Sequence, residues 1–285
     1  MPQRQKTIKS SISFEGIGLH SGEKIRVIVR PAPTGHGIVF RRIDCDPVVV
    51  IPASYHFIHS TTLCTTLSSS GKSIATVEHF LSAVSGVGLD NLLVDVEGPE
   101  LPIMDGSAAP FVFLLNAAGV QTQPASKKML LITDKVEVTD GNKYCGIEPC
   151  DHFSVSLSIN YNQTVVDQTV QQASYHQSTD CYARSVSRAR TFGFIKDVKK
   201  MMALELIKGA STKNAIVVGD HEVVNDSGLR SGDEFVKHKI LDAIGDLALV
   251  GSPISGHYYG YCSGHRLNKL LIDKIISTRS YEWVL

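Results

Sequence analysis

The chain has 285 residues, enough for one large domain or two medium ones, and is 43% hydrophobic and 20% charged. This composition is typical of a soluble, well-packed protein and excludes a disordered one. Basic and acidic residues number 28 each, so the charge gives no support for nucleic-acid binding. No segment approaches the roughly 20 apolar residues of a membrane-spanning helix, and we therefore expect no transmembrane segment.

The N-terminus and the cysteines indicate a cytoplasmic protein. Residues 1–6 are polar and lack the apolar core of a signal peptide. The six cysteines show no CxxC spacing, which favours free thiols in an intracellular chain over a disulfide scaffold.

In the first half of the chain, strands are expected before helices. Hydrophobic and polar residues first alternate with a period of two, which predicts strands. Apolar residues then recur at three- and four-residue steps, which predicts a helix that follows Ser73 and that Gly86 or Gly88 can end. The expected elements are strands at 7–14, 24–30 and 91–96, a glycine-rich turn at 16–22, and helices at 74–86 and 110–118.

The second half repeats this order after a break. Residues 121–128 contain Pro124 and no apolar pattern, so we interpret them as a linker. Strands are expected at 129–139, 144–149, 153–161, 215–218 and 257–262, and helices at 234–250 and 266–276. Strands followed by helices in each half predict an α+β fold rather than a doubly wound sheet. We expect two domains, residues 1–125 and 126–285.

The helix expected at 234–250 carries polar residues on an otherwise apolar face. Ser231 and Glu234 have the spacing of a capping box at its start. His238, Asp242 and Asp246 are each four residues apart, so a helix places them one above another. A buried carboxylate needs a cation or a hydrogen-bond partner, and imidazole with carboxylate is an ordinary zinc ligand set. The alternative is a buried polar network without a metal.

Two other positions could complete a catalytic metal site. In the Glu78-His79 pair, His79 could bind the metal while Glu78 takes a proton from a water beside it. The alternative is a surface pair on an amphipathic helix. His265 follows a strand and precedes a helix, where it could donate a proton and be held by Asp246. A helix-capping or surface histidine is the alternative there.

Taken together, six separated motifs resemble one enzyme family, the UDP-3-O-acyl-N-acetylglucosamine deacetylases, which are the zinc amidases of lipid A synthesis. The resemblance covers essentially the whole chain. The motifs are GIGLHSG at 16–22, TVEH at 76–79, PIMDGS at 102–107, SRARTFGF at 187–194, HKILDAIGD at 238–246 and SGH at 263–265.

The resemblance implies a fold and a set of roles. It implies two α+β domains, each a layered β-α-α-β sandwich, with the active site at the domain interface. Its Zn²⁺ ligands would be His79, His238 and Asp242. Glu78 would be the general base, and His265 the general acid. Asp246 would orient His265, and Thr191 would help to hold the oxyanion.

The resemblance also implies substrate contacts with a UDP-linked acyl amino-sugar. Lys239 and Lys143 would meet the phosphates, and Tyr161 the uracil ring. Positions near the acyl group would be Leu19, Phe192, Phe194, Val198 and Ile207. The segment 208–211 departs from the usually apolar acyl passage, and Cys262 stands where some relatives have lysine.

Hydrolysis of an acetamide fits these residues, because the metal polarises the carbonyl and activates water while an acid protonates the leaving nitrogen. Two other classes of protein stay open at this point. One is a binding or scaffold protein with a structural zinc, for which Glu78 and His265 would be dispensable. The other is a zinc amidase that acts on a different N-acetylated sugar. We expect a monomer.

Overall fold

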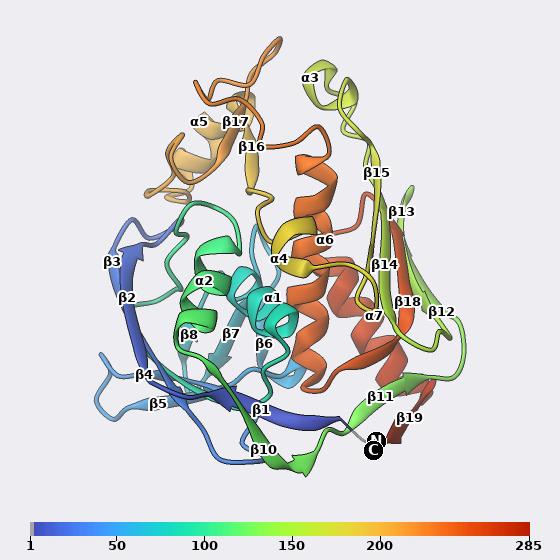
Figure 1. Ribbon diagram of the computed structural model, residues 1–285. Helices are drawn as coiled ribbons and strands as arrows, with labels where there is room; N and C mark the ends of the chain where they lie inside the picture. Colours follow the sequence, from blue (N-terminus) through green and yellow to red (C-terminus); the bar gives the residue numbers. More distant parts are fainter. Residues whose placement is uncertain (1–2) are drawn as a thin grey trace.

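A computed structural model describes residues 3–285 and shows helices enclosed between two sheets (Figure 1). The helices α1 (Glu78–Val87), α2 (Ala109–Ala117), α6 (Glu234–Leu247) and α7 (His265–Thr278) form the middle of the molecule. The order of layers is therefore sheet, helices, helices, sheet. The predicted α+β class is confirmed. The β-α-α-β layers, which were expected within each domain, are instead formed once by the two halves of the chain together.

The first sheet is built from the N-terminal half of the chain and packs on α1 and α2. Its strand order is β2 (Ile12–Ile17), β3 (Lys24–Pro31), β9 (Leu92–Glu97), β4 (Ile38–Arg42) and β5 (Val49–Pro52). Alternate residues of β3 are buried, as its period-two pattern predicts. A smaller sheet joins β6 (Ile58–Ser60), β7 (Thr66–Ser69) and β8 (Lys72–Ile74), and the short helix η1 (Tyr55–Phe57) precedes β6.

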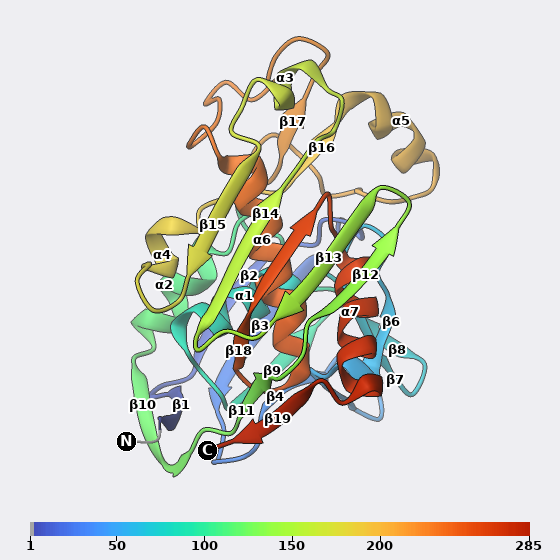
Figure 2. The same ribbon diagram turned by 90° about the vertical axis from the view of Figure 1, so that its right-hand side faces the viewer.

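The second sheet is built from the C-terminal half and packs on α6 and α7, as Figure 2 shows. Its central strand is β18 (Ile254–Tyr261), which pairs with three neighbours. Those neighbours are β11 (Met129–Ile132), β13 (Lys143–Glu148) and β14 (Phe153–Ser158). Outer strands are β12 (Val136–Asp140), β15 (Gln172–His176) and β19 (Tyr281–Val284).

A third group of short elements lies between β15 and α6 in the chain. It comprises α4 (Tyr182–Ser185), β16 (Phe192–Phe194), α5 (Ile195–Ala203) and β17 (Ile216–Val218). The strands β16 and β17 pair in parallel. Two further short helices are α3 (Thr164–Asp167), before β15, and η2 (Ala248–Val250), after α6.

Several predicted boundaries are wrong for identifiable reasons. The helix expected from residue 74 begins at Glu78, because Ile74 ends β8 and Thr76 has a left-handed backbone with φ of 57°. The expected linker 121–128 is largely strand β10 (Val120–Ser126), which pairs with β1 (Arg4–Ile8). The segment expected as one strand at 129–139 is divided into β11 and β12. The division into domains 1–125 and 126–285 stays a prediction.

The capping box expected at the start of α6 does not form. Ser231 donates its hydroxyl to Asp233 instead. The Glu234 carboxylate is fully buried and accepts hydrogen bonds from the Arg190 side chain at 2.8 Å and from the Arg230 amide at 2.6 Å. An ion pair with a distant residue thus replaces the local cap and ties the start of α6 to the segment before β16.

The helices α1 and α6 pack tightly against each other at Gly245. A Cβ atom at Gly245 would lie 2.0 Å from the carbonyl oxygen of Glu78, closer than any real contact. The absence of a side chain therefore allows α6 to pass against the start of α1. This contact brings Glu78 and His79 to the face of α6 that carries His238 and Asp242.

We expect Gly245→Ala to destabilise the fold by about 1–3 kcal/mol, because the added methyl group meets backbone atoms that can move only if the helices separate. Gly232→Ala is the matched control, since a Cβ there meets nothing within 4 Å, and it should change stability by less than about 0.5 kcal/mol. Denaturant unfolding measures both. Equal effects would contradict the close packing of α1 on α6.

The predictions on thiols and membrane spans can also be compared with the structure. All six cysteines lie within the described residues and are free. No helix in residues 3–285 has the length and apolar character required to cross a membrane.

Candidate active site

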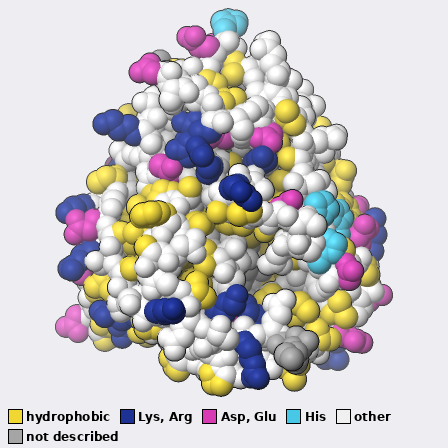
Figure 3. Space-filling model, viewed as in Figure 1, with side chains coloured by type: hydrophobic (Ala, Val, Ile, Leu, Met, Phe, Trp, Pro, Cys, Tyr) yellow, Lys and Arg dark blue, Asp and Glu magenta, His cyan; other side chains and the backbone are white. Residues whose placement is uncertain are grey.

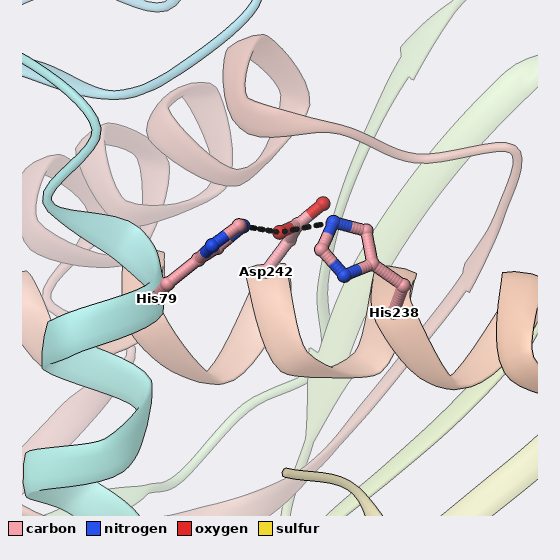
Figure 4. A group of neighbouring side chains, drawn as sticks. All are labelled: His79, His238 and Asp242. Atoms are coloured by element: carbon pink, nitrogen blue, oxygen red, sulfur yellow. Dashed lines mark ion pairs between the residues drawn. The ribbon is translucent and has the colours of Figure 1, made fainter. Parts of the chain in front are cut away.

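Three potential metal ligands meet between α1 and α6. Figure 4 shows His79 from α1 and His238 and Asp242 from α6 pointing toward one another. The Nε2 atoms of His79 and His238 lie 3.6 and 3.4 Å from the same oxygen, Oδ1 of Asp242. All three side chains are buried, and their ligand atoms lie within 4.8 Å of one another. We call these residues the metal trio.

The metal trio fits a zinc ion. Oδ1 of Asp242 is buried and has no hydrogen-bond partner among residues 3–285, which is costly unless a cation binds it. The Nδ1 of His238 donates to the carbonyl oxygen of Ala189 at 3.1 Å, so its Nε2 is left with a free lone pair. Burial lowers the pKa of His238 to about 3, which keeps the ring neutral as metal binding requires.

The second oxygen of Asp242 has a different partner. The Lys239 ammonium donates to Oδ2 of Asp242 at 2.6 Å. Burial would raise the pKa of Asp242, but the charge of the Lys239 ammonium holds it well below its usual range. Asp242 is therefore a carboxylate, with one oxygen held by a lysine and the other directed at the two imidazoles.

Glu78 lies beside the metal trio. It is 3% exposed, and its Oε2 accepts a hydrogen bond from the Thr65 amide at 3.1 Å. Burial raises the pKa of Glu78, so its carboxylate has a greater affinity for a proton than a carboxylate in water. A group of this kind suits a general base.

His265, at the start of α7, lies next to Glu78. Its Nδ1 donates to Oδ2 of Asp246 at 2.8 Å, and its Nε2 lies 3.8 Å from Oε1 of Glu78. Burial alone would lower the pKa of His265, but the Asp246 carboxylate outweighs this effect and raises it to about 9. His265 is thus held protonated near neutral pH, as a general acid must be.

Two residues that the sequence did not indicate also donate hydrogen bonds to Asp246. Thr65 donates its hydroxyl to Oδ1 at 2.6 Å, and Asn268 donates its amide to Oδ2 at 2.7 Å. Asn268 is one helical turn after His265, a spacing that could have indicated it. Thr65 lies 181 residues from Asp246, and no local pattern connects the two.

Thr191 is positioned by the backbone on both sides. Its amide donates to the carbonyl oxygen of Gly106 at 2.8 Å, and its own carbonyl oxygen accepts from the Ile216 amide at 2.8 Å. Gly106 has φ of 87°, and a Cβ there would lie 2.2 Å from the backbone of Asn214. Only glycine fits at this crossing, which explains its place in the 102–107 motif.

Three predicted substrate residues form an aromatic group next to the metal trio. The ring of Tyr161 lies 5.5 Å from those of Phe192 and Phe194, and the Phe192 ring lies 6.1 Å from that of His238. Burial raises the pKa of Tyr161, while the nearby Lys239 ammonium opposes that shift. The structure therefore brings Tyr161, Phe192 and Lys239 to the same side of the site.

The glycine-rich turn meets the segment that follows α5. The Leu19 carbonyl oxygen accepts from the Gly209 amide at 3.0 Å, and the His20 carbonyl oxygen accepts from the Lys208 amide at 3.1 Å. Leu19 and Ile207 are both half-buried. Lys208 is 49% exposed in its side chain and its ammonium pairs with Glu205 at 3.1 Å, so its charge is at the surface.

Two predicted substrate residues are not joined to the metal trio. Lys143 is exposed at the start of β13, opposite Asp140. Val198 is half-buried on α5. In the part of the chain that the structure describes, no hydrogen bond, ion pair or aromatic contact links either residue to His79, His238 or Asp242.

Known proteins resemble this chain over nearly its full length. A family model described as LpxC, UDP-3-O-acyl N-acetylglycosamine deacetylase, matches residues 5–277. A UDP-3-O-acyl-N-acetylglucosamine deacetylase of Xanthomonas axonopodis pv. citri is 46% identical over 282 residues, 99% of this chain and 93% of that protein. Proteins of the same name from Legionella pneumophila (strain Corby) and Alcanivorax borkumensis are both 48% identical. They cover 98% and 99% of this chain and 92% and 93% of their own lengths.

Proposed function

The chain belongs to the LpxC family of UDP-3-O-acyl N-acetylglycosamine deacetylases, and on that premise we propose that it deacetylates UDP-3-O-acyl-N-acetylglucosamine. Water and the N-acetyl group would give acetate and the free amine, UDP-3-O-acyl-glucosamine, in lipid A biosynthesis. The observation that carries the proposal is the metal trio with Glu78 and His265 beside it.

We propose Zn²⁺ as the cofactor and His79, His238 and Asp242 as its ligands. When bound, zinc polarises a carbonyl and lowers the pKa of a coordinated water. The unpartnered Oδ1 of Asp242 and the free lone pair of His238 support this assignment. A site with three ligands leaves a fourth position open, as catalytic zinc sites do.

The acid and base roles follow from the protonation states of two neighbours. Glu78 would accept the proton of the attacking water, because its buried carboxylate binds a proton more readily than usual. His265 would give its proton to the leaving nitrogen, and Asp246 would hold the ring in that orientation and stabilise its charge. Thr191 would help to hold the oxyanion.

The substrate would contact two sets of residues beside the metal trio. Lys239 and Lys143 would meet the phosphates, and Tyr161 would stack on the uracil ring. Leu19, Phe192, Phe194, Val198 and Ile207 would lie along the acyl chain. The contacts among Tyr161, Phe192 and Phe194 support a shared aromatic surface for these groups. The cytoplasmic location and the monomeric state stay predictions.

A direct assay tests the proposed function. The purified protein should release acetate from the UDP-linked acyl sugar, lose that activity with a chelator, and regain it with zinc. A structural-zinc scaffold predicts no turnover at all. Comparable turnover of an N-acetylated sugar without the UDP group would instead favour the other amidase class.

Shortening the acyl chain should weaken catalysis strongly. Each buried methylene contributes about 0.8 kcal/mol, so a substrate lacking four of them should lose about 200-fold in kcat/KM, at 1.4 kcal/mol per factor of ten. The comparison uses two substrates that differ only in chain length. Equal kcat/KM values would contradict an acyl passage along Phe194 and Ile207.

A further inference from the structure

Three histidines gather on the outer face of the second sheet, away from the helices. In register, His176 of β15 lies opposite Ser154 of β14, and Ser154 lies opposite His257 of β18. The neighbouring residues Phe153 and Val155 are buried on the other face. Figure 3 shows histidine side chains together at the right-hand side of the molecule, over these strands.

The third histidine, His152, precedes β14. The two residues before it, Cys150 and Asp151, supply a thiol and a carboxylate. The Sγ of Cys150 lies 3.7 Å from Nδ1 of His152 and 3.8 Å from Oδ1 of Asp151. The same Nδ1 and Oδ1 lie 2.5 Å apart. These three ligand atoms lie within 4.8 Å of one another. The ring of His176 is 6.0 Å from that of His152, between centroids.

We propose that Cys150, Asp151 and His152 form a second site for a zinc-like divalent cation, with His176 within reach as a fourth ligand. This peripheral site shares no residue with the metal trio. A thiol with an imidazole favours zinc and other borderline or soft transition metals over Mg²⁺ or Ca²⁺.

Two of the three ligand separations agree with a tetrahedral ion. Zinc ligand bonds of about 2.3 Å to sulfur and 2.0–2.1 Å to nitrogen or oxygen place such ligands roughly 3.6 Å apart at a tetrahedral angle. The 3.7 and 3.8 Å separations of Sγ from Nδ1 and Oδ1 are close to this value. Nδ1 and Oδ1 now share a hydrogen bond. Metal binding would release the thiol proton, the Nδ1 proton of the neutral imidazole would move to Nε2, and Nδ1 and Oδ1 would separate around the ion.

The peripheral site is open to solvent. The Asp151 side chain is 93% exposed, so the ion can enter from solvent.

Counting bound metal tests the peripheral site. Chelator-treated protein in reducing buffer is titrated with Zn²⁺, and the bound metal is measured by mass spectrometry after equilibrium dialysis. The unmodified protein should bind two equivalents. Loss of an outer partner of a metal site typically lowers metal affinity by about 10- to 100-fold. Cys150→Ser and His152→Ala each remove a direct ligand, so each should weaken the binding of one equivalent by at least that factor. The controls are Cys45→Ser and His221→Ala, which change the same residue types elsewhere in the chain. Both variants should still bind two equivalents of zinc.

Cobalt distinguishes the two sites. The peripheral site contains a thiolate and the metal trio does not, so bound Co²⁺ should give a thiolate-to-metal absorption band that Cys150→Ser removes. Asp242→Ala should keep this band while losing the other equivalent. Binding of a single equivalent by the unmodified protein, or two unaltered equivalents in both Cys150→Ser and His152→Ala, would overturn the proposal and leave the proposed deacetylase activity untouched.

Discussion

Asp242→Ala should remove the catalytic metal and abolish turnover. The substitution deletes the only anionic ligand of the metal trio and leaves two neutral imidazoles. It also removes the carboxylate that holds the ammonium of the half-buried Lys239 at 2.6 Å, so some loss of stability is expected as well. Bound zinc, activity and the free energy of unfolding should therefore be measured on the same sample.

A surface aspartate provides the control for this variant. Asp273 pairs with Lys269 on α7 with an exposed side chain, and such pairs are worth about 0–1 kcal/mol. Asp273→Ala should keep the metal and the activity. If Asp242→Ala retains the zinc of the metal trio and full activity, His79, His238 and Asp242 are not the ligand set.

The polar face of α6 could be predicted from the sequence because this helix is long and regular. Four-residue steps place His238, Asp242 and Asp246 on one helical face whatever the rest of the fold does. Their buried apolar neighbours implied that these polar groups needed partners. The pairing of Asp246 with His265 was expected, whereas the partners Ala189, Thr65 and Asn268 are brought to this face only by the folded chain.

The errors arose where distant contacts override local patterns. Glu234 has capping-box spacing, yet its carboxylate accepts a hydrogen bond from the side chain of Arg190, 44 residues earlier. Thr76 takes a left-handed backbone, a conformation that residue type alone does not indicate for threonine. Gln123 looked like a linker residue, but it is buried, donating to the Ala32 carbonyl oxygen and accepting from Asn91. Polar residues that pair across strands leave no hydrophobic pattern to detect.

The general-base role proposed for Glu78 leads to the second large expected effect. Glu78→Gln keeps the shape of the side chain and an oxygen for the Thr65 amide, while it removes the base. Zinc should therefore stay bound, and kcat should fall by about 10²- to 10⁴-fold, the usual contribution of a general base. Loss of zinc from Glu78→Gln would indicate a structural role for Glu78 instead.

The pH dependence of kcat/KM separates the acid from the base. Glu78 acts as a carboxylate, so activity should fall as the pH drops through its raised pKa. His265 acts as an imidazolium, so activity should fall as the pH rises through a pKa of about 9, which the Asp246 carboxylate maintains against burial. The profile should be bell-shaped. In His265→Ala the residual activity should lose the alkaline limb and keep the acidic one, whereas His221→Ala, at an exposed position, should leave both. An alkaline limb that persists in His265→Ala would assign the acid to another group, because the imidazole that titrates there would be absent.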